Sequence, residues 1–412
     1  MPSSRTNQSL FSPLTVRNYR YLYVGQAVSG LGNGMFVVAL AWTVYGLTGS
    51  AADMGAVLIA DIVPQLALVT YAGVLADRIS RRLVILFSNV GAGLVTLILS
   101  LALAAHKLDA AGLIVCSFLL GGATAFFGPA FNAIFKNVLK PTELRAGNSL
   151  RSITNSINRL VGPTLGGVIY AFGGGILAFG IDAVTFFFAA LTVAFVIVPE
   201  SPVGRSGGAI SDARDGFKYV FSTPWLLSIT LIALVANTVC IAPMEVLLGM
   251  VVRESHAGSL FLGAVLSTQA SFAVIGATLV GKFGSRIQPT VAFYVLVVIM
   301  ACGVLAIGLH MGDWTVLLGA SLIGVGFTFG SVEDTVLQRY VPDEYLGRVY
   351  GVGVMAAFSL FPIGYAIAGF WATSVGPFHV LMASGAIGIF ASIICYRVIG
   401  LRSRSEMTQQ VL

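Results

Sequence analysis

Six ionisable residues interrupt long apolar runs of this 412-residue chain: the acids Asp61, Asp182, Glu245, Glu333 and Asp334, and the base Arg159. A charged side chain at the centre of a membrane-spanning helix costs at least ~2.5–3.5 kcal/mol, so it needs a partner, water or a function. A carboxyl group that alternates between apolar and hydrated surroundings binds a proton in one and releases it in the other. These residues are therefore the candidates for proton chemistry.

Spacing groups some of these residues with polar neighbours. Ser152, Asn155 and Arg159 follow an i, i+3, i+7 pattern, which gives one polar stripe on a helix and predicts that the stripe faces a water-filled cavity. Gln65 lies one helical turn from Asp61. We hypothesise that Asp61 or Asp182 binds and releases the proton, tuned by Arg159. Glu245, Glu333 and Asp334 are further candidates closer to run ends, and the alternative for each residue is a structural ion pair or a solvated helix end.

The elements that carry these residues are predicted to be membrane-spanning helices. Hydrophobic residues make up 57% of the chain and charged residues 10%, against roughly 25% charged residues in soluble domains. A membrane helix needs about 20 mostly apolar residues. Twelve stretches qualify: 20–46, 54–75, 83–105, 111–135, 150–172, 176–198, 225–251, 259–281, 290–309, 314–338, 348–373 and 377–399. They are continuous runs without the alternation of barrel strands, so an all-α integral membrane fold is expected.

The distribution of Lys and Arg predicts the orientation. With the N-terminus in the cytoplasm, all but three of the 23 basic residues fall on inner segments; the exceptions are Lys107, Arg253 and Arg159. This bias follows the positive-inside rule and predicts an inner (plasma) membrane protein with both termini cytoplasmic. Since the basic residues are spread over separate loops, the net charge of +6 does not indicate nucleic-acid binding.

The chain reads as two similar halves. Residues 199–224 form the longest polar stretch between the runs and, with their Gly and Ser content, read as a flexible cytoplasmic linker between six-helix bundles at 1–198 and 225–412. Phe127-Gly128 and the polar segment after it are echoed by Phe329-Gly330 about two hundred residues later. An even number of helices per half makes this a parallel repeat with a pseudo-two-fold axis along the membrane normal, an arrangement that permits alternating access.

The loop between the second and third runs carries the most specific motif, Gly73-Val74-Leu75-Ala76-Asp77-Arg78-Ile79-Ser80-Arg81-Arg82. It resembles the loop signature G-x-L-A-D-R-x-G-R-R of the major facilitator superfamily, with Ser80 where the family usually has Gly, and the resemblance covers the whole chain. It implies the major facilitator fold, and it implies that Gly73, Asp77, Arg78, Arg81 and Arg82 form a latch that stabilises the outward-facing state. The alternative is that the charged residues of this loop only determine the orientation of the helices in the membrane.

Gly162-Pro163-Thr164-Leu165-Gly166-Gly167 in the fifth run resembles the G-P-x-x-G-G motif of exporters in that superfamily. The first run resembles the macrolide- and siderophore-exporter branch, although Asn33 stands where many relatives have an acid. The fourth run has no Arg between 117 and 130, in contrast to several drug:proton antiporters. Physically, Gly162, Pro163, Gly166 and Gly167 predict a closely packed, kinkable helix; ordinary packing is the alternative.

Other function classes find little support. The four cysteines and four histidines are dispersed and form no metal-binding or H-E-x-x-H pattern, so no metal, no cofactor and no enzymatic activity are expected. The predicted function is secondary active efflux of a small amphiphilic compound, such as an antibiotic, natural product or siderophore, by proton antiport. The expected partners are that substrate and the bilayer, with the protein working as a monomer. The alternatives are an importer or facilitator of a small metabolite and, more remotely, a membrane-embedded enzyme.

Overall fold

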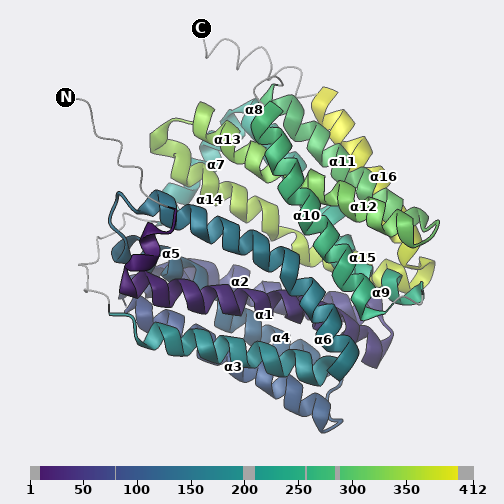
Figure 1. Ribbon diagram of the computed structural model, residues 1–412. Coiled ribbons are helices and arrows are strands. Elements are labelled where there is room, and N and C mark those ends of the chain that lie inside the picture. Colours follow the sequence, from purple (N-terminus) through teal and green to yellow (C-terminus); the bar gives the residue numbers. More distant parts are fainter. Residues whose placement is uncertain (1–9, 79, 198–208, 256–257, 284–287, 398–412) are drawn as a thin grey trace. The chain divides into compact units, whose positions relative to one another are not determined.

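A computed structural model describes residues 10–78, 80–197, 209–255, 258–283 and 288–397. Within these ranges, the side chains of residues 69–78, 136, 209–213, 283, 289 and 343 are outside the description. The regular elements in the described ranges are all helical (Figure 1).

The contacts between helices divide the chain into two compact units, residues 1–48 with 60–204 and residues 49–59 with 205–412. Before the linker segment the chain forms η1 (Ser12–Thr15), α1 (Arg17–Thr48), α2 (Ala51–Arg78), α3 (Arg81–Ala104), α4 (Ala110–Ala125), α5 (Phe127–Val138) and α6 (Leu144–Ala194). It continues with α7 (Ala209–Ser222), α8 (Pro224–Val235), the π-helix η2 (Ala236–Ile241), α9 (Ala242–Glu254), α10 (Ser259–Phe283) and α11 (Pro289–Leu309). The last helices are α12 (Asp313–Gly326), α13 (Phe329–Tyr340), α14 (Asp343–Ser359), α15 (Phe361–Val375) and α16 (Pro377–Cys395).

Eleven of the described helical stretches are long and apolar enough to cross a membrane. The longest, α6, covers 51 residues but contains Gly174 with φ 61° and ψ −164°, which is outside the helical region. Glycine adopts positive φ without steric cost, so the chain turns at Gly174 and α6 consists of two spans. The described helices thus account for the twelve predicted spans, and the prediction of an all-helical membrane protein is confirmed.

The echo between the two halves of the sequence corresponds to equal local structure. Phe127 begins α5 directly after a break at Phe126, and Phe329 begins α13 directly after a break at Thr328. Each of these helices has 12 residues and is followed by extended backbone, at Leu139 and at Val341. The same residue pattern therefore gives the same break in each half.

In the first unit, α1 lies along α6, and α3 also packs on α6 (Figure 1). One end of this unit holds a buried cluster in which Tyr19 and Leu22 of α1 meet Ile85 of α3, Phe131 of α5 and Val193 of α6. These side chains are all nearly inaccessible to solvent. The cluster fixes the start of α1 against the helices that carry the candidate site.

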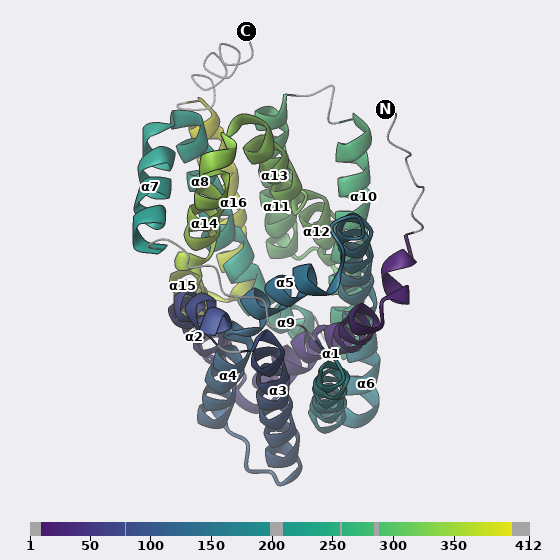
Figure 2. The ribbon, with the colours of Figure 1, turned by 90° about the vertical axis from the view of Figure 1, so that its left-hand side faces the viewer.

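In the second unit, α7 lies beside α14 (Figure 2). Val220 is 2% exposed, and the ring of Tyr219 stacks on Tyr345 with centroids 4.6 Å apart. Residues 209–222, which the sequence predicts as part of a flexible linker, are therefore a docked helix instead. The Gly- and Ser-rich part of that linker, residues 204–208, lies outside the described residues, whereas within 209–222 Tyr219 stacks on Tyr345 and Gly216 lies against Arg348 of α14.

Candidate functional site

The stretch 162–167, which resembles the exporter motif, lies where α6 crosses α1. A Cβ atom at Gly162 would lie 2.8 Å from the Cα atom of Gly34, and one at Gly166 would lie 2.8 Å from the Cα atom of Met35. Pro163 and Gly167 are buried in the same stretch of helix. The glycines therefore allow two backbones to touch, which is the predicted close packing. The helix turns at Gly174 rather than at Pro163.

The loop signature lies at the end of α2 and the start of α3. Gly73, Asp77 and Arg78 belong to the last turns of α2, but their side chains lie outside the described residues. Arg81 and Arg82 open α3, and Arg82 donates a hydrogen bond from Nη2 to the carbonyl oxygen of Ala194, the last residue of α6. A guanidinium at that position complements the negative end of the α6 dipole.

Asp61 lies in α2 and is half-buried. The Gln65 side chain donates from Nε2 to Asp61 Oδ2 at 2.9 Å and to the Asp61 carbonyl oxygen at 3.2 Å, which confirms the predicted neighbourhood of these residues. Gly121 of α4 packs directly on this turn, since a Cβ atom there would overlap the Asp61 carbonyl oxygen. In the part of the chain that the structure describes, no ion pair with Asp61 occurs.

Asp182 lies in α6 after the turn at Gly174 and is 0% exposed. Thr185 Oγ1 donates to the Asp182 carbonyl oxygen at 2.8 Å and lies 3.4 Å from Oδ1, while Oδ2 has no hydrogen-bond partner. The carboxyl group faces α1, because a Cβ atom at Gly32 would overlap Oδ1. A buried carboxyl with one unsatisfied oxygen is costly and therefore marks a candidate functional group.

Arg159 does not pair with either acid. Its side chain is exposed on α6, as are Ser152 and Asn155 of the predicted polar stripe. Asp182 is fully buried, and the ion pairs of the described residues include none between Arg159 and Asp61 or Asp182. The stripe exists, but the structure does not bring Arg159 together with either carboxyl group.

The remaining acids lie in the second unit. Glu245 of α9 accepts a hydrogen bond at 2.5 Å on Oε2 from the hydroxyl of Tyr365 of α15. Asp334 of α13 is exposed, and its carbonyl oxygen accepts from the Tyr350 hydroxyl at 3.4 Å. Glu333 beside it is half-buried. These contacts tie neighbouring helices together within the unit.

A cavity of about 170 Å³ lies between α1, α5 and α6 of the first unit. Its walls combine aromatic rings with hydrogen-bonding groups and contain no acid: Tyr19, Leu22, Tyr23, Gln26, Ala27, Gly30, Asn33, Phe127, Phe131, Phe135, Arg151, Thr154 and Asn155. Aromatic walls with a few placed polar groups are the usual lining of a small-molecule site. This cavity is our candidate binding site.

Sequence reasoning missed Arg151 and Gln26 as cavity residues. The charge pattern counts Arg151 among the topogenic residues of an inner loop, whereas the structure places it within α6, on the cavity wall. The available signal was the spacing to Asn155, which lies one helical turn further on and belongs to the predicted polar stripe. Gln26, an amide in the first apolar run, carried a similar signal.

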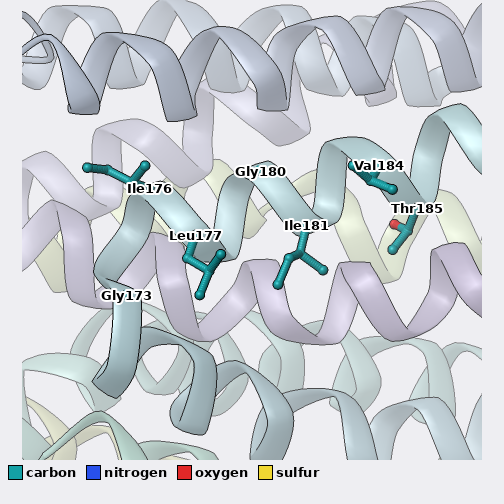
Figure 3. Close-up of a pocket in the computed structure, with 7 residues that line it drawn as sticks. All are labelled: Gly173, Ile176, Leu177, Gly180, Ile181, Val184 and Thr185. Carbon is teal, nitrogen blue, oxygen red and sulfur yellow. The ribbon is translucent and has the colours of Figure 1, made fainter.

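An open groove of about 400 Å³ runs along α6 from its turn into the span that follows (Figure 3). It is lined by Gly173, Ile176, Leu177, Gly180, Ile181, Val184 and Thr185, and Figure 3 shows Thr185 as the one side chain among them with an oxygen. That hydroxyl is already engaged by Asp182. The groove therefore offers apolar surface and no free polar group for recognition.

Comparison with known proteins agrees with this architecture. The family model described as Major Facilitator Superfamily matches residues 22–359. The multidrug efflux pump Tap of Mycolicibacterium fortuitum is 28% identical over 365 residues, covering 84% of this chain and 87% of that protein. Macrolide efflux protein A of Streptococcus pyogenes is 22% identical over 383 residues, covering 91% and 94%.

Solved structures share the fold at low identity. A mutant form of the nucleoside transporter NupG has a TM-score of 0.77 at 12% identity and covers 92% of this chain and 99% of its own. A bacterial homologue of the iron transporter ferroportin in an inward-facing state has a TM-score of 0.74 at 14% identity, covering 94% and 99%. The chain belongs to the Major Facilitator Superfamily and is a membrane transporter of a small molecule, not an enzyme.

Proposed function

We propose that this transporter exports a small amphiphilic compound from a bacterial cytoplasm, driven by proton antiport. The observation that carries the proposal is the similarity along most of the chain to two proteins named as efflux pumps. The exporter motif at the α1–α6 crossing and the aromatic cavity beside it support the same reading. The substrate is an antibiotic, another natural product or a siderophore.

Proton coupling is assigned to Asp61. Its carboxyl group is half-buried, so that it can exchange a proton with water, and its described contacts are a neutral amide rather than a cation. A change in hydration during the cycle would alter its proton affinity. Asp182 is wholly buried and is the second candidate, while Arg159, Glu245 and Asp334 line the route or brace the helices.

The transport cycle is alternating access by two six-helix bundles, residues 1–198 and 225–412, with both termini in the cytoplasm and the protein acting as a monomer. The loop residues Gly73, Asp77, Arg78, Arg81 and Arg82 act as the latch of the outward-facing state. One of these residues, Arg82, contacts the end of α6, which supports a role of the loop in holding helix ends together.

The proposal is tested in cells loaded with a lipophilic dye or an antibiotic. Energised extrusion from cells that a protonophore abolishes is the expected result. Asp61→Asn should abolish gradient-driven extrusion while the protein remains in the membrane at normal amounts. Asp53→Asn, a substitution of the same chemistry in the first turn of α2, should retain extrusion. Energised accumulation in cells would instead establish import, and unchanged extrusion by Asp61→Asn would remove Asp61 from the mechanism.

A further inference from the structure

We infer that the cavity between α1, α5 and α6 binds the aromatic carboxylate end of an anionic amphiphile. The inference names the substrate class of the proposed transport function and rests on it. It follows from the charge, the unsatisfied donors and the size of the cavity, all within the first unit.

The charge of the cavity comes from Arg151. Its guanidinium carbon lies 5.0 Å from the ring centroid of Phe131, and Nη1 donates to Asn132 Oδ1 at 2.8 Å. No Asp or Glu lines the cavity, and the ion pairs of the described residues do not include Arg151. A guanidinium has five N–H donors in a planar fork that matches a carboxylate, and Asn132 occupies one of them. The cavity therefore presents a cation whose remaining donors suit an anionic group.

A second donor points to the same chemistry. The amide nitrogen of Gln26 is buried and has no hydrogen-bond partner, although Gln26 lines the cavity. A buried donor without an acceptor lowers stability, and a bound acceptor removes that cost. The hydroxyls of Tyr23 and Thr154 lie 2.6 Å apart and satisfy each other, so they compete less for a ligand. The cation and the unsatisfied amide nitrogen are both donors, so they favour an acceptor, and the positive charge of Arg151 disfavours an ammonium group.

The volume of the cavity and its aromatic side chains indicate which apolar group the ligand carries beside its anionic group. Phe127 and Phe131 stack with centroids 5.3 Å apart, and an aromatic ligand gains from offset or edge contacts with such rings. The volume of about 170 Å³ is close to the ~150 Å³ at which an apolar cavity accepts benzene. One aromatic ring with a carboxylate fits this space. The exposed side chains of Asn33 and Asn155 mark the open side, from which the remainder of a larger amphiphile would extend.

Binding of three small probes to the purified full-length protein tests the inference. The probes are benzoate, its neutral relative benzamide and the cation benzylammonium, measured by equilibrium titration in lipid nanodiscs without a proton gradient. We expect benzoate to bind at least about tenfold more tightly than benzylammonium, the scale of one charge-assisted hydrogen bond. Equal affinities for benzoate and benzylammonium would overturn the inference.

Substitutions locate the binding. Arg151→Gln should weaken benzoate about tenfold and leave benzamide within about twofold, since the lost interaction is with the charge. Arg145→Gln, an exposed arginine earlier in α6 that does not line the cavity, is the matched control and should bind benzoate normally. Unchanged benzoate affinity in Arg151→Gln would contradict the assignment.

A variant of Asn132, the hydrogen-bond partner of Arg151, distinguishes the loss of the Arg151 charge from a structural effect of the Arg151→Gln substitution. Asn132→Ala removes the contact at 2.8 Å but keeps the charge, so it should retain the preference for benzoate. If Asn132→Ala lost that preference as fully as Arg151→Gln, the charge would not be the cause and the inference would fail. Because binding is measured without a gradient, loss of proton-driven efflux would overturn the proposed function and leave this result intact. Conversely, energised extrusion without anion preference would overturn only the inference.

Discussion

Gly34 and Gly162 touch through their backbones: a Cβ atom at Gly34 would lie 2.7 Å from the Cα atom of Gly162. The contact joins α1 to the stretch 162–167 of α6 and lies between the spans that carry the cavity residues. Small residues allow such close approach of membrane helices, where packing rather than the hydrophobic effect drives association. The glycine at this crossing therefore sets the geometry of the cavity wall.

The first prediction is that even the smallest side chain disturbs this crossing. Gly162→Ala should lower stability by about 1–3 kcal/mol, the usual cost of overpacking, because the neighbouring atoms are backbone and cannot rotate away. Thermal unfolding in detergent measures the effect. Gly122→Ala on α4 is the control, since a Cβ atom there meets nothing within 4 Å. Equal melting temperatures for the two variants would contradict the tight crossing.

The second prediction separates the two candidate acids of the first unit, Asp61 and Asp182. Asp182→Asn keeps the volume of the side chain and the Thr185 hydrogen bond to the carbonyl oxygen, so we expect the variant to fold and to remain in the membrane. We expect gradient-driven extrusion to persist in Asp182→Asn and to be lost in Asp61→Asn, because Asp61 is accessible to water and Asp182 is not. The measurement is efflux at a series of imposed pH gradients. The reverse pattern would assign coupling to Asp182.

The third prediction concerns what holds α7 on α14. Arg348 and Asp215 lie 3.6 Å apart with side chains 34% and 52% exposed, so Asp215→Asn should cost at most about 1 kcal/mol. Val220 is 2% exposed, and Val220→Asp should cost about 2 kcal/mol or more by burying an unpaired polar group. The rate of protease cleavage within residues 209–222 reports undocking. A larger effect from Asp215→Asn than from Val220→Asp would show that the ion pair, not apolar contact, docks the helix.

The fourth prediction is a pH dependence of the same contact. Burial, followed by the neighbouring Tyr345 and Glu344, raises the pKa of Tyr219 above its ordinary value of 10.0. The docked helix therefore holds its proton more tightly than the undocked one, so docking is fully stable below about pH 10 and weakens as the pH rises through the raised pKa.

Tyr219→Phe should remove this loss of docking at high pH, as followed by cleavage within residues 209–222 between about pH 8 and 11. Tyr170→Phe, on α6 of the other unit, is the control for general effects of losing a phenol and should keep the pH dependence. A Tyr219→Phe protein that undocks over the same pH range as the unaltered chain would rule out Tyr219 as the titrating group.

The membrane spans and their breaks could be read from the sequence because they depend on local properties. The length of an apolar run decides whether a helix can cross a bilayer, and the run 150–198 is interrupted at Gly173-Gly174-Gly175, where the structure turns. The repeated Phe-Gly pair indicated that the halves are similar, whereas the starts of α5 and α13 at these pairs, inside the runs 111–135 and 314–338, came from the structure. The resemblance of the loop and exporter motifs to one superfamily was also readable, since it lies in residue types and spacing.

Which polar side chains meet was decided by the tertiary structure. Arg159 was the expected partner of Asp61 or Asp182, yet it is exposed and pairs with neither among the described residues, whereas Arg151 and Gln26 share a cavity that no sequence interval predicts. The same holds for α7, in which Gly216 and Tyr219 face Arg348 and Tyr345 of α14. The sequence of an apolar helix determines that it enters the membrane, but its rotation and crossing are set by packing against neighbouring helices. Those two variables determine which side chains share a site.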